Sequence, residues 1–549
     1  MKIFKIILVL TGIMVFLVCA FFSSTSSFSQ HEENLPVASV STEIKNNRDV
    51  SDNTGFPKIS PANLPDAFKF KTWVLSGKKV SQSFSRTDAI SFGDPSDYAR
   101  VDGVVCFRGN NYRNSASYGY ARISLEKLEK VWNRRTGRID SWTGVGWTGQ
   151  PAVIKWDESL KQKMNLFERA KKKKELKEVI CGALDGRVYF LDLETGEPTR
   201  PSINIPGPIK GSISVDPRGI PLMYIGQGID TVNGKRVSIG YSVYSLLDEK
   251  RLFFINGRDK SALKGWGAFD SNGLVHAGSD TLIEAGENGL VYTVKLNTTF
   301  NPERGLLQIR PEVVKYRYRC SLNKQSGVEN SIAVYKHFAY FADNDGVLQC
   351  LDLNTLIPVW ARSVTDDTDS TTVLEETGEG VFLYTGCEVD KQGKGGSSYV
   401  RKINALTGET MWERSFSCSY DVYTNGGILG TPALGKHDIG NLVVYSIARC
   451  NGPKGGRLVA FDKRDGKTVW EIPLSYYSWS SPVDVYTPDG KGYIVFCDSA
   501  GNMFLIDGRK GIIRDKVNLG ANVEGSPAVY DDMVVVGTRG QKIWGVRIR

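Results

Sequence analysis

The sequence predicts an all-β protein, an eight-bladed β-propeller of four-stranded blades whose last blade is closed by an N-terminal strand. Three observations lead to this prediction: a composition rich in turn residues, a hairpin pattern that recurs along the chain, and a last repeat that is one strand short. Glycine makes up 57 of 549 residues and methionine only 7, which favours many tight turns over long helices. With 41% hydrophobic and 23% charged residues, the chain can bury a large core.

The recurring hairpin combines alternating apolar residues with an Asp or Asn, a Gly a few residues later, and, in the clearest copies, an exit strand with a tryptophan. Alternation buries one set of side chains, and Asp, Asn and Gly supply the turn. We expect the tryptophan to cover the joint with a neighbouring blade. Clear copies lie at residues 186–196, 346–355, 400–408, 457–466 and 501–511, with weaker copies at 241–248 and 289–297.

A second pattern opens each unit, a small residue and often proline before an apolar strand. It occurs at residues 149–153, 430–434, 480–483 and 525–529, in weaker form at 211–215, 329–334 and 370–373, and a further start lies near 268–275. These starts define eight units at a spacing of roughly 40–60 residues. About four strands per unit at this spacing indicate a propeller rather than a two-sheet sandwich.

The last unit has room for three strands only, at residues 527–530, 533–537 and 542–548. A lone exit strand with its tryptophan, Trp132, occurs much earlier, at residues 128–132. We therefore expect N-terminal residues to complete the final blade, because a propeller cannot leave that edge exposed.

Four segments are predicted along the chain. Residues 1–29 are a signal peptide or an N-terminal membrane anchor, since Lys2 and Lys5 precede an apolar run at 6–22. Residues 30–61 are a flexible linker, 62–99 an N-terminal extension, and 100–549 the propeller. The charge bias predicts an extracytoplasmic protein, in the periplasm or at the cell surface.

Several function classes find no support. The formal charge of +9 is modest for this length and gives no indication of nucleic-acid binding. The four histidines are too scattered for a zinc cage, and the sequence contains no CxxC pair. The GxGxxG match at residues 144–149 precedes a strand instead of a helix, so it is not a dinucleotide loop.

The Asp-to-Gly hairpins with their tryptophans, and the small-Pro-Ala-Val openings, resemble the pyrroloquinoline-quinone (PQQ)-like repeat β-propellers. This superfamily includes quinoprotein alcohol dehydrogenases and an outer-membrane assembly lipoprotein. The resemblance covers about residues 100–549. Residues 106–113, Cys-Phe-Arg-Gly-Asn-Asn-Tyr-Arg, are also similar to the Phe-Arg-Gly segment that precedes the first blade in bacterial members.

The resemblance allows three functions, because the same propeller carries enzymes and scaffolds. The first is a non-catalytic binding or scaffold protein of the cell envelope, without a cofactor, whose partner is a protein or an envelope polymer. The second is a PQQ-dependent dehydrogenase of alcohols or sugars, which holds PQQ with Ca²⁺. The third is a propeller that binds a carbohydrate or another ligand. The vicinal cysteine pair and the CxxCH haem motif of quinoprotein dehydrogenases are absent from this sequence. Some sugar-oxidising relatives also lack the pair, but we favour the non-enzyme.

Ring closure should bring together the segments that precede each innermost strand, around the central channel. Their aromatic, carboxylate and amide groups suit a sugar, a cation or a peptide, although interblade packing and solvated loops would use the same residues. The candidate ligand-binding residues are Trp147, Gln150, Trp266, Glu329, Asn330, Asp369, Asn425, Trp479, Glu524 and Arg539. Within this set Glu329, Asp369 and Glu524 form a candidate Ca²⁺ site.

A lysine-rich insertion at residues 160–179 interrupts the first blade. Its apolar residues Leu160, Met164, Phe167 and Ala170 recur at helical spacing, which predicts a short basic amphipathic helix or a strand-linking protrusion. Such a segment would contact anionic lipid headgroups or an acidic partner, or would simply be a solvated loop.

Overall fold

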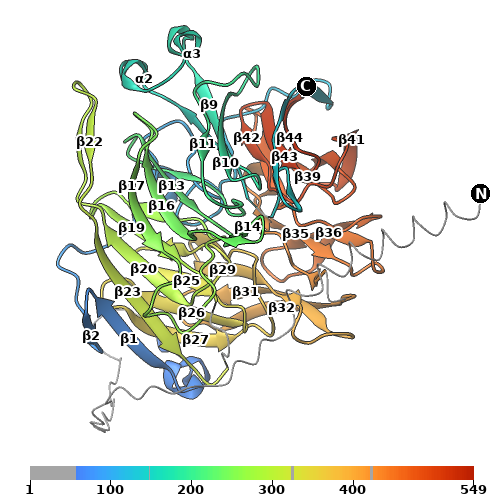
Figure 1. Ribbon diagram of the computed structural model, residues 1–549. Coiled ribbons are helices and arrows are strands. Elements are labelled where there is room, and N and C mark those ends of the chain that lie inside the picture. Colours follow the sequence, from blue (N-terminus) through green and yellow to red (C-terminus); the bar gives the residue numbers. More distant parts are fainter. Residues whose placement is uncertain (1–56, 148, 323–326, 421–423) are drawn as a thin grey trace, which may run out of the picture. The chain divides into compact units, whose positions relative to one another are not determined.

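Eight antiparallel sheets follow one another along the chain as the blades of a propeller (Figure 1). The structure is a computed structural model that describes residues 57–549 except 148, 323–326 and 421–423. The predicted N-terminal segment 1–29 and most of the predicted linker therefore lie outside the described residues. The predicted fold class is confirmed, and each predicted unit start coincides with the start of a blade.

Each of the first four blades runs outward from the propeller axis. Blade 1 consists of β8 (Ala152–Lys155), β9 (Lys177–Gly182), β10 (Arg187–Asp192) and β11 (Ile203–Asn204). Blade 2 consists of β12 (Ser214–Val215), β13 (Leu222–Gly226), β16 (Gly240–Ser245) and β17 (Arg251–Asn256). Blade 3 contains β18 (Leu274–His276), β19 (Thr281–Ala285), β20 (Leu290–Lys295) and β23 (Glu312–Arg319), and blade 4 contains β24 (Ala333–Tyr335), β25 (Phe338–Ala342), β26 (Val347–Asp352) and β27 (Ile357–Ser363).

The remaining blades repeat this order. Blade 5 consists of β28 (Val373–Thr377), β29 (Gly380–Gly386), β31 (Ser397–Asn404) and β32 (Thr410–Ser417). Blade 6 consists of β34 (Ala433–Leu434), β35 (Leu442–Ala448), β36 (Gly456–Asp462) and β37 (Thr468–Leu474), joined by β30 (Glu388–Val389) and β33 (Gly426–Gly427). Blade 7 consists of β38 (Val483–Tyr486), β39 (Gly492–Cys497), β40 (Asn502–Asp507) and β41 (Ile512–Asn518).

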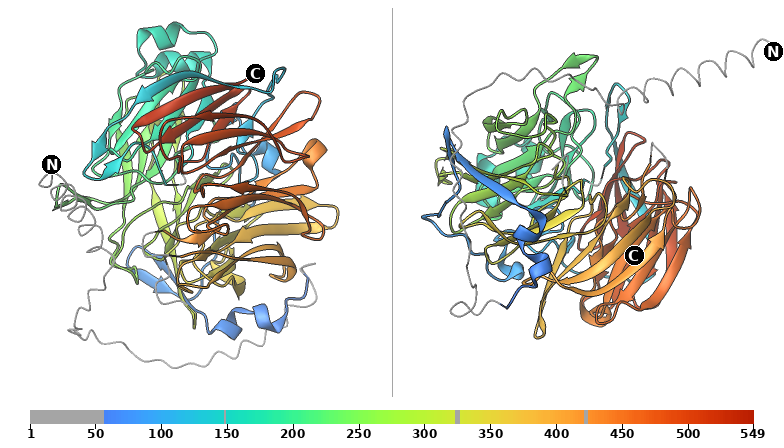
Figure 2. Two further views of the ribbon diagram at one scale, coloured as in Figure 1. Left: turned by 90° about the vertical axis from the view of Figure 1, so that its right-hand side faces the viewer. Right: turned by 90° about the horizontal axis from the view of Figure 1, so that it is seen from below.

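Blade 8 closes the ring with strands from both ends of the described chain. It consists of β42 (Ala528–Tyr530), β43 (Met533–Thr538), β44 (Lys542–Ile548) and β5 (Leu128–Arg135). The strand β5 pairs antiparallel with β44 from Leu128 opposite Ile548 to Arg135 opposite Lys542. In Figure 2 the blue-green β5 lies beside the red strands of this blade. Closure by an N-terminal strand is therefore confirmed.

The repeated tryptophan and glycine form the joint between neighbouring blades. The indole nitrogens of Trp360, Trp412 and Trp470 each donate a hydrogen bond of 2.8–2.9 Å to a backbone oxygen in the next blade. Trp132 makes the same bond, 2.8 Å, to Leu193 of blade 1. The repeat glycine lies against the ring, since a Cβ on Gly466 would stand 2.6 Å from the Trp412 ring. Only glycine fits both this contact and the left-handed turn, where φ is +69° at Gly466.

The small-residue openings form a second ring of contacts close to the axis, the hydroxyl ring. In six of the eight blades the backbone N–H at one position donates to the side chain of the equivalent residue in the next blade. The bonds run from Gln150 to Ser212 (2.8 Å), Asn272 to Ser331 (3.0 Å), Ser331 to Thr371 (2.9 Å), Thr371 to Thr431 (3.0 Å), Thr431 to Ser481 (3.0 Å) and Ser481 to Ser526 (3.3 Å). The Asn272 amide donates to Ser212 O at 3.1 Å, and Ser526 N donates to Gly149 O at 2.9 Å, which completes the circle.

Residues 103–118, the axial segment, cross the ring and contact all eight blades. The strand β3 (Gly103–Val104) pairs with β8 of blade 1, and β4 (Ser117–Tyr118) pairs in parallel with β42 of blade 8. Between them, backbone and side-chain hydrogen bonds reach blades 2 to 7. The guanidinium of Arg108 donates to Pro432 O and Pro482 O, and that of Arg113 donates to Phe107 O, Ile332 O and Asn272. The Phe-Arg-Gly segment is thus a structural element that joins the blades.

The N-terminal extension adds strands to blade 3 and covers blade 4. β1 (Lys71–Ser76) pairs antiparallel with β23, and β2 (Lys79–Ser81) pairs with β1, so blade 3 has six strands. The 3-10 helices η2 (Pro61–Asn63) and η3 (Pro65–Phe68) lie against β27. Two further 3-10 helices are η4 (Pro95–Asp97) and η5 (His437–Ile439), and three small hairpins are β6 (Arg138–Ile139) with β7 (Trp142–Thr143), β14 (Thr231–Val232) with β15 (Lys235–Arg236), and β21 (Thr299–Asn301) with β22 (Leu306–Gln308).

The lysine-rich insertion forms two short helices, α2 (Glu158–Lys163) and α3 (Glu168–Lys172), instead of one amphipathic helix. Leu160, Met164 and Ala170 are buried as helical spacing predicts, but Phe167 is 41% exposed. The chain is extended at Met164 and at Phe167, which ends α2 and starts α3. Among the described residues no helix is long and apolar enough to cross a membrane.

Candidate binding site at one end of the propeller axis

Two positions in each blade supply the side chains at one end of the propeller axis. The first lies two residues before the hydroxyl-ring position, and the second lies in or near the connection after the second strand of the blade. The first position provides Lys210, Asp270, Glu329, Asp369, Trp479 and Glu524, and the second provides Glu287, Asn344, Glu388 and Arg539. Because both positions recur at the same place in every blade, the ring brings these residues to a common end.

Carboxylates from blades 3 to 5 form the acidic half of the site. Carboxylate oxygens of Asp270, Glu287 and Glu329 all lie within 4.8 Å of one another. The Asn344 amide donates to Glu329 at 2.6 Å, and more weakly to Asp367 at 3.4 Å. Asp270 is 8% and Glu287 4% exposed, whereas Glu329 is partly exposed and opens the group to solvent.

The acidic half continues through Asp367, Asp369 and Glu388. Burial, together with the neighbouring Glu329, raises the pKa of Asp367 to about 8. Burial and the surrounding carboxylates raise the pKa of Asp369 and of Glu388 well above their ordinary values, and the two carboxyls share a hydrogen bond. The pKa of Glu287 is raised well above its ordinary value by burial and then by Glu329 and Asp270. The acidic half thus holds more carboxyl groups than it can keep ionised.

Two lysines supply part of the missing positive charge. The ammonium of Lys210 lies 2.7 Å from Asp270, and that of Lys391 lies 3.4 Å from Asp367. Burial lowers the pKa of Lys210, but the carboxylates of Asp270, Glu287 and Glu329 outweigh it and the net pKa is raised. Even so, Asp270 Oδ1, Glu287 Oε1 and Glu388 Oε1 are buried without a hydrogen-bond partner among the described residues. A buried polar atom left in this way is costly, so the acidic half is suited to an added cation.

Blades 7, 8 and 1 form the aromatic half of the site. The rings of Trp147 and Trp479 lie 5.4 Å apart between centroids, and both are partly exposed. The Lys210 ammonium lies 4.1 Å from the centroid of the Trp147 ring, in a cation–π contact that joins the two halves. Glu524 pairs with Arg539 at 3.0 Å and accepts a hydrogen bond from Trp147 N at 3.1 Å.

The other predicted site residues take different positions. Gln150 is buried, where it accepts from Arg108 N at 2.9 Å and donates to Pro527 O at 2.7 Å. Asn330 is also buried and bonds to Ala342 O and Thr368 O, so both amides hold the blades together. Asn425 donates to Glu388 at 2.6 Å and borders the acidic half, and Trp266 lies partly buried between β17 and β18.

Sequence reasoning did not find Lys210, Asp270, Glu287 or Glu388. For Lys210 and Asp270 a signal was present, because each stands two residues before the hydroxyl-ring position of its blade, as Glu329 and Asp369 do. Glu287 and Glu388 follow the second strands of their blades, and only the closed ring shows that such residues reach the axis.

The fold and the site define a closed eight-bladed β-propeller with an acidic and an aromatic half at one end of its axis. The sequence model of the family described as outer membrane protein assembly factor BamB matches residues 454–549. The resemblance to PQQ-like repeat propellers is confirmed. The matched segment contains the last two strands of blade 6, all of blade 7, and the three strands of blade 8 that come from the C-terminal end of the chain.

Solved structures of similar fold include BamB and two dehydrogenases. BamB from Moraxella catarrhalis is 15% identical, with a TM-score of 0.48, and the match covers 76% of this chain and 99% of that chain. A europium-containing methanol dehydrogenase is 13% identical, with a TM-score of 0.40, over 81% of this chain and 98% of that chain. The quinohemoprotein alcohol dehydrogenase from Comamonas testosteroni is 13% identical, with a TM-score of 0.40, over 82% of this chain and 81% of that chain. No curated protein matches the sequence.

Proposed function

We propose that the protein is a non-catalytic binding protein of the cell envelope whose acidic half takes a cationic group of a protein or polymer partner. The observation that carries this proposal is the pair of buried oxygens, Asp270 Oδ1 and Glu287 Oε1, that have no partner among the described residues. A lysine or arginine side chain would supply both the charge and the hydrogen-bond donors that these oxygens lack.

The chain's own Lys210 shows how an ammonium group is held here. Its nitrogen is hydrogen-bonded to Asp270 and lies over the face of Trp147. A second ammonium or guanidinium would find further carboxylates in Glu287 and Glu329, and a further aromatic ring at this end of the axis in the partly exposed Trp479, 5.4 Å from Trp147. Carboxylates beside an aromatic face are a favourable environment for a cation.

The charge of the site argues against the quinone-dependent alternative. PQQ is itself a polycarboxylate, and in the acidic half it would meet carboxyl groups whose pKa values are already raised by burial and by neighbouring carboxylates. The cations Lys210, Lys391 and Arg539 are already paired with Asp270, Asp367 and Glu524. The residues present therefore do not fit PQQ, and the vicinal cysteine pair is absent from the sequence.

A second candidate ligand is a divalent cation held by Asp270, Glu287 and Glu329. Their oxygens are within 4.8 Å of one another, a separation that suits a common ion at Ca²⁺–oxygen distances of about 2.3–2.6 Å. This set shares Glu329 with the site that the sequence predicts. It replaces Glu524, which is paired with Arg539, and Asp369, which is bonded to Glu388.

The envelope location rests on the N-terminal sequence, with its basic start and apolar run at residues 6–22. Membrane-surface contact through residues 160–179 belongs to the same proposal. Lys163, Lys172 and Lys174 are exposed there beside the exposed Phe167, a combination that suits an anionic headgroup layer.

Thermal melting of the purified protein with added cations tests the proposed function. An oligolysine peptide should raise the melting temperature of the parent, by a mass-action stabilisation of about 2.7 kcal/mol at a hundred times the dissociation constant. The double variant Asp270→Asn, Glu287→Gln should lose the response, whereas the exposed control Glu303→Gln should retain it. Calcium chloride is added in a separate experiment. If calcium chloride raises the melting temperature of the parent and oligolysine does not, the site binds a metal ion. Absence of a shift in both arms, or turnover of an alcohol after incubation with PQQ and Ca²⁺, would overturn the proposal.

A further inference from the structure

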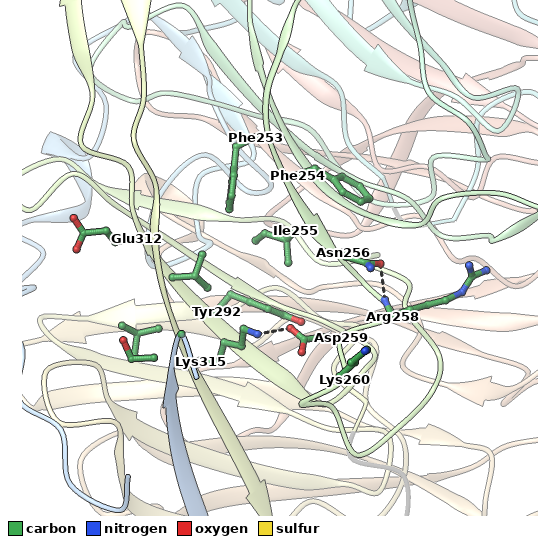
Figure 3. A pocket seen from close by; sticks show the side chains of 14 residues that line it. Phe253, Phe254, Ile255, Asn256, Arg258, Asp259, Lys260, Tyr292, Glu312 and Lys315 are labelled. Atoms are coloured by element: carbon green, nitrogen blue, oxygen red, sulfur yellow. Dashed lines mark hydrogen bonds and ion pairs between the residues drawn. The ribbon is translucent and has the colours of Figure 1, made fainter. Parts of the chain in front are cut away.

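Blades 2 and 3 differ in width, and the difference leaves a groove on the outside of the propeller. Blade 2 ends at β17, whereas blade 3 continues past β23 into β1 and β2. A cavity of about 680 Å³ lies at this step, lined by β17, by residues 312–315 of β23 and by Ser76 and Gly77 of the turn between β1 and β2. Figure 3 shows Phe253, Phe254 and Ile255 in succession along β17, with Glu312 and Lys315 across from them.

The outer edge of β17 has free hydrogen-bonding groups. Gly257 N donates to Ile239 O at 2.9 Å, and the register pairs Ile255 with Tyr241 and Phe253 with Val243. In an antiparallel pair these alternate residues bond to the partner strand, so the N–H and C=O groups of Phe254 and Asn256 point outward. Across the described ranges, no other backbone group is hydrogen-bonded to them.

The composition of β17 also sets it apart from the other outer strands. Natural edge strands carry charges or proline that prevent pairing with another chain. Such residues interrupt the outer strands of blades 4 to 7: Pro358 and Arg362 in β27, Glu413 and Arg414 in β32, Glu471 and Pro473 in β37, and Arg514, Asp515 and Lys516 in β41. In β17 the four residues from Leu252 to Ile255 are all apolar, and Phe253 and Phe254 are partly exposed.

We propose that this step is a docking site for an extended segment of a partner protein, added to β17 as a fifth strand of blade 2. Apolar side chains on one face of the segment would pack on the overhanging face of blade 3. Acidic side chains on the other face are expected from the charge of the groove. Lys315 and Arg258, which line the groove, are paired with Asp259 and Asp230, both at 2.5 Å. Two exposed cations, Lys260 in the lining and Arg251 at the start of β17, have no carboxylate within ion-pair distance among the described residues, against one lining carboxylate, Glu312, without a cationic partner there.

The neighbouring blade shows that such an addition is compatible with this rim. There β1 runs antiparallel to β23 over six paired positions, from Lys71 opposite Arg319 to Ser76 opposite Val314. The turn at Ser76 and Gly77 flanks the groove, which leaves room for one extended strand beside β17. The edge of a second propeller would bring a whole blade against this turn, so a single segment is the occupant that fits.

A ten-residue peptide that alternates valine with glutamate, carrying a fluorescent label, tests the docking site on the full chain. We expect saturable binding by anisotropy, at least tenfold weaker for a peptide in which lysine replaces glutamate. Binding should also slow hydrogen exchange at residues 252–256. Phe254→Lys and, independently, Asn256→Pro should each weaken binding at least tenfold. The matched control Val469→Lys, on the edge strand β37, should not.

The melting temperature of each variant shows whether it is folded. If Phe254→Lys does not fold, Asn256→Pro still tests the docking site, because Asn256 is exposed and its substitution should not disturb the core. Equal binding by the parent and the edge variants, or no saturable binding, would overturn the proposal. Light scattering provides the remaining arm. A dimer of the parent that becomes a monomer in Phe254→Lys would assign the edge to a second copy and also overturn it. None of these residues belongs to the acidic half, so the result is independent of the proposed cation site.

Discussion

The axial segment and the acidic half both place charged side chains inside the ring, but they satisfy them differently. Arg113 is fully buried, and its guanidinium donates to three backbone carbonyl oxygens and an amide oxygen. Glu287 is nearly as buried, yet its Oε1 has no partner among the described residues. A buried charged group with all its hydrogen bonds inside the protein holds the fold together, whereas a buried carboxyl oxygen without a partner requires a donor or a cation from outside.

The two regions therefore respond differently to change. Disruption of the axial segment should destabilise the whole ring, because the segment contacts every blade. Neutralising a carboxyl in the acidic half should leave the fold intact and change the dependence of stability on pH and on added cations. The predictions below separate these two responses.

The largest effect is expected from removing the axial segment and β5 together. A chain that starts at residue 138 loses the outer strand of blade 8 and the contacts that join all the blades, so it should show no cooperative melting transition. A chain that starts at residue 100 keeps both and loses only β1, β2 and the rest of the extension, so its transition should persist at a reduced temperature. Calorimetry compares the two. Equal melting temperatures for both truncations would show that closure by β5 is not required.

A single substitution in the axial segment should have the next largest effect. Arg113→Met removes the donor to three buried backbone carbonyl oxygens and one of the two donors to the Asn272 amide oxygen, and should lower the free energy of unfolding by about 3–5 kcal/mol. The control Arg258→Met removes a partly exposed arginine from Asp230 and should cost about 1 kcal/mol or less. Urea denaturation measures both. A similar loss in the two variants would remove the distinction between the axial segment and the rim.

Much of this architecture could be predicted from the sequence because it depends on short sequence patterns that recur in each repeat. The Asp-to-Gly turn and the tryptophan recur in each repeat, and the structure shows the glycine and the indole in contact at the joint. The opening residues also recur, and they form the hydroxyl ring. The strand that contains Trp132 could be identified from the sequence because no hairpin precedes it, whereas the last repeat has a hairpin but no exit strand after Ile548.

The remaining features depend on contacts between distant residues. Nothing in the six residues of β1 indicates that they pair with β23, about 240 positions further on, and the axial segment has no strand-like alternation to reveal its contacts with eight blades. The acidic half was found in part, through Glu329 and Asp369. Glu287 and Glu388 join it through turns whose convergence exists only in the closed ring.

A dependence of stability on pH should distinguish the acidic half from the rest of the molecule. Burial and Glu329 raise the pKa of Asp367 to about 8, from a value near 3.9 in an unfolded chain. Between these values the folded protein keeps a proton that the unfolded chain has lost. The contribution of Asp367 to stability is therefore fully present below about pH 4 and is lost as the pH rises towards 8, by at most about 1.4 kcal/mol per pH unit.

Asp367→Asn should flatten this decline, and the exposed control Glu303→Gln should leave it unchanged. Urea denaturation at pH 5, 6, 7 and 8 gives the slope for each protein. Parallel slopes for the parent and Asp367→Asn would show that this carboxyl is ionised in the folded state, contrary to the crowding that the structure indicates.

The smallest effect is expected in the aromatic half, from Glu524→Gln. This carboxylate is neutralised by Arg539 at 3.0 Å in a pair that remains partly accessible to solvent, so its loss should change the free energy of unfolding by about 1 kcal/mol or less. The stabilisation by oligolysine or Ca²⁺ should persist in Glu524→Gln and disappear in Glu287→Gln, because Glu287, unlike Glu524, has a buried oxygen without a partner among the described residues. Melting with and without the cation gives both quantities. Loss of the stabilisation in Glu524→Gln as well would mean that the two halves act as one site around Lys210, which contacts both Asp270 and Trp147. The cation would then be held by the wider set of carboxylates that the sequence predicts.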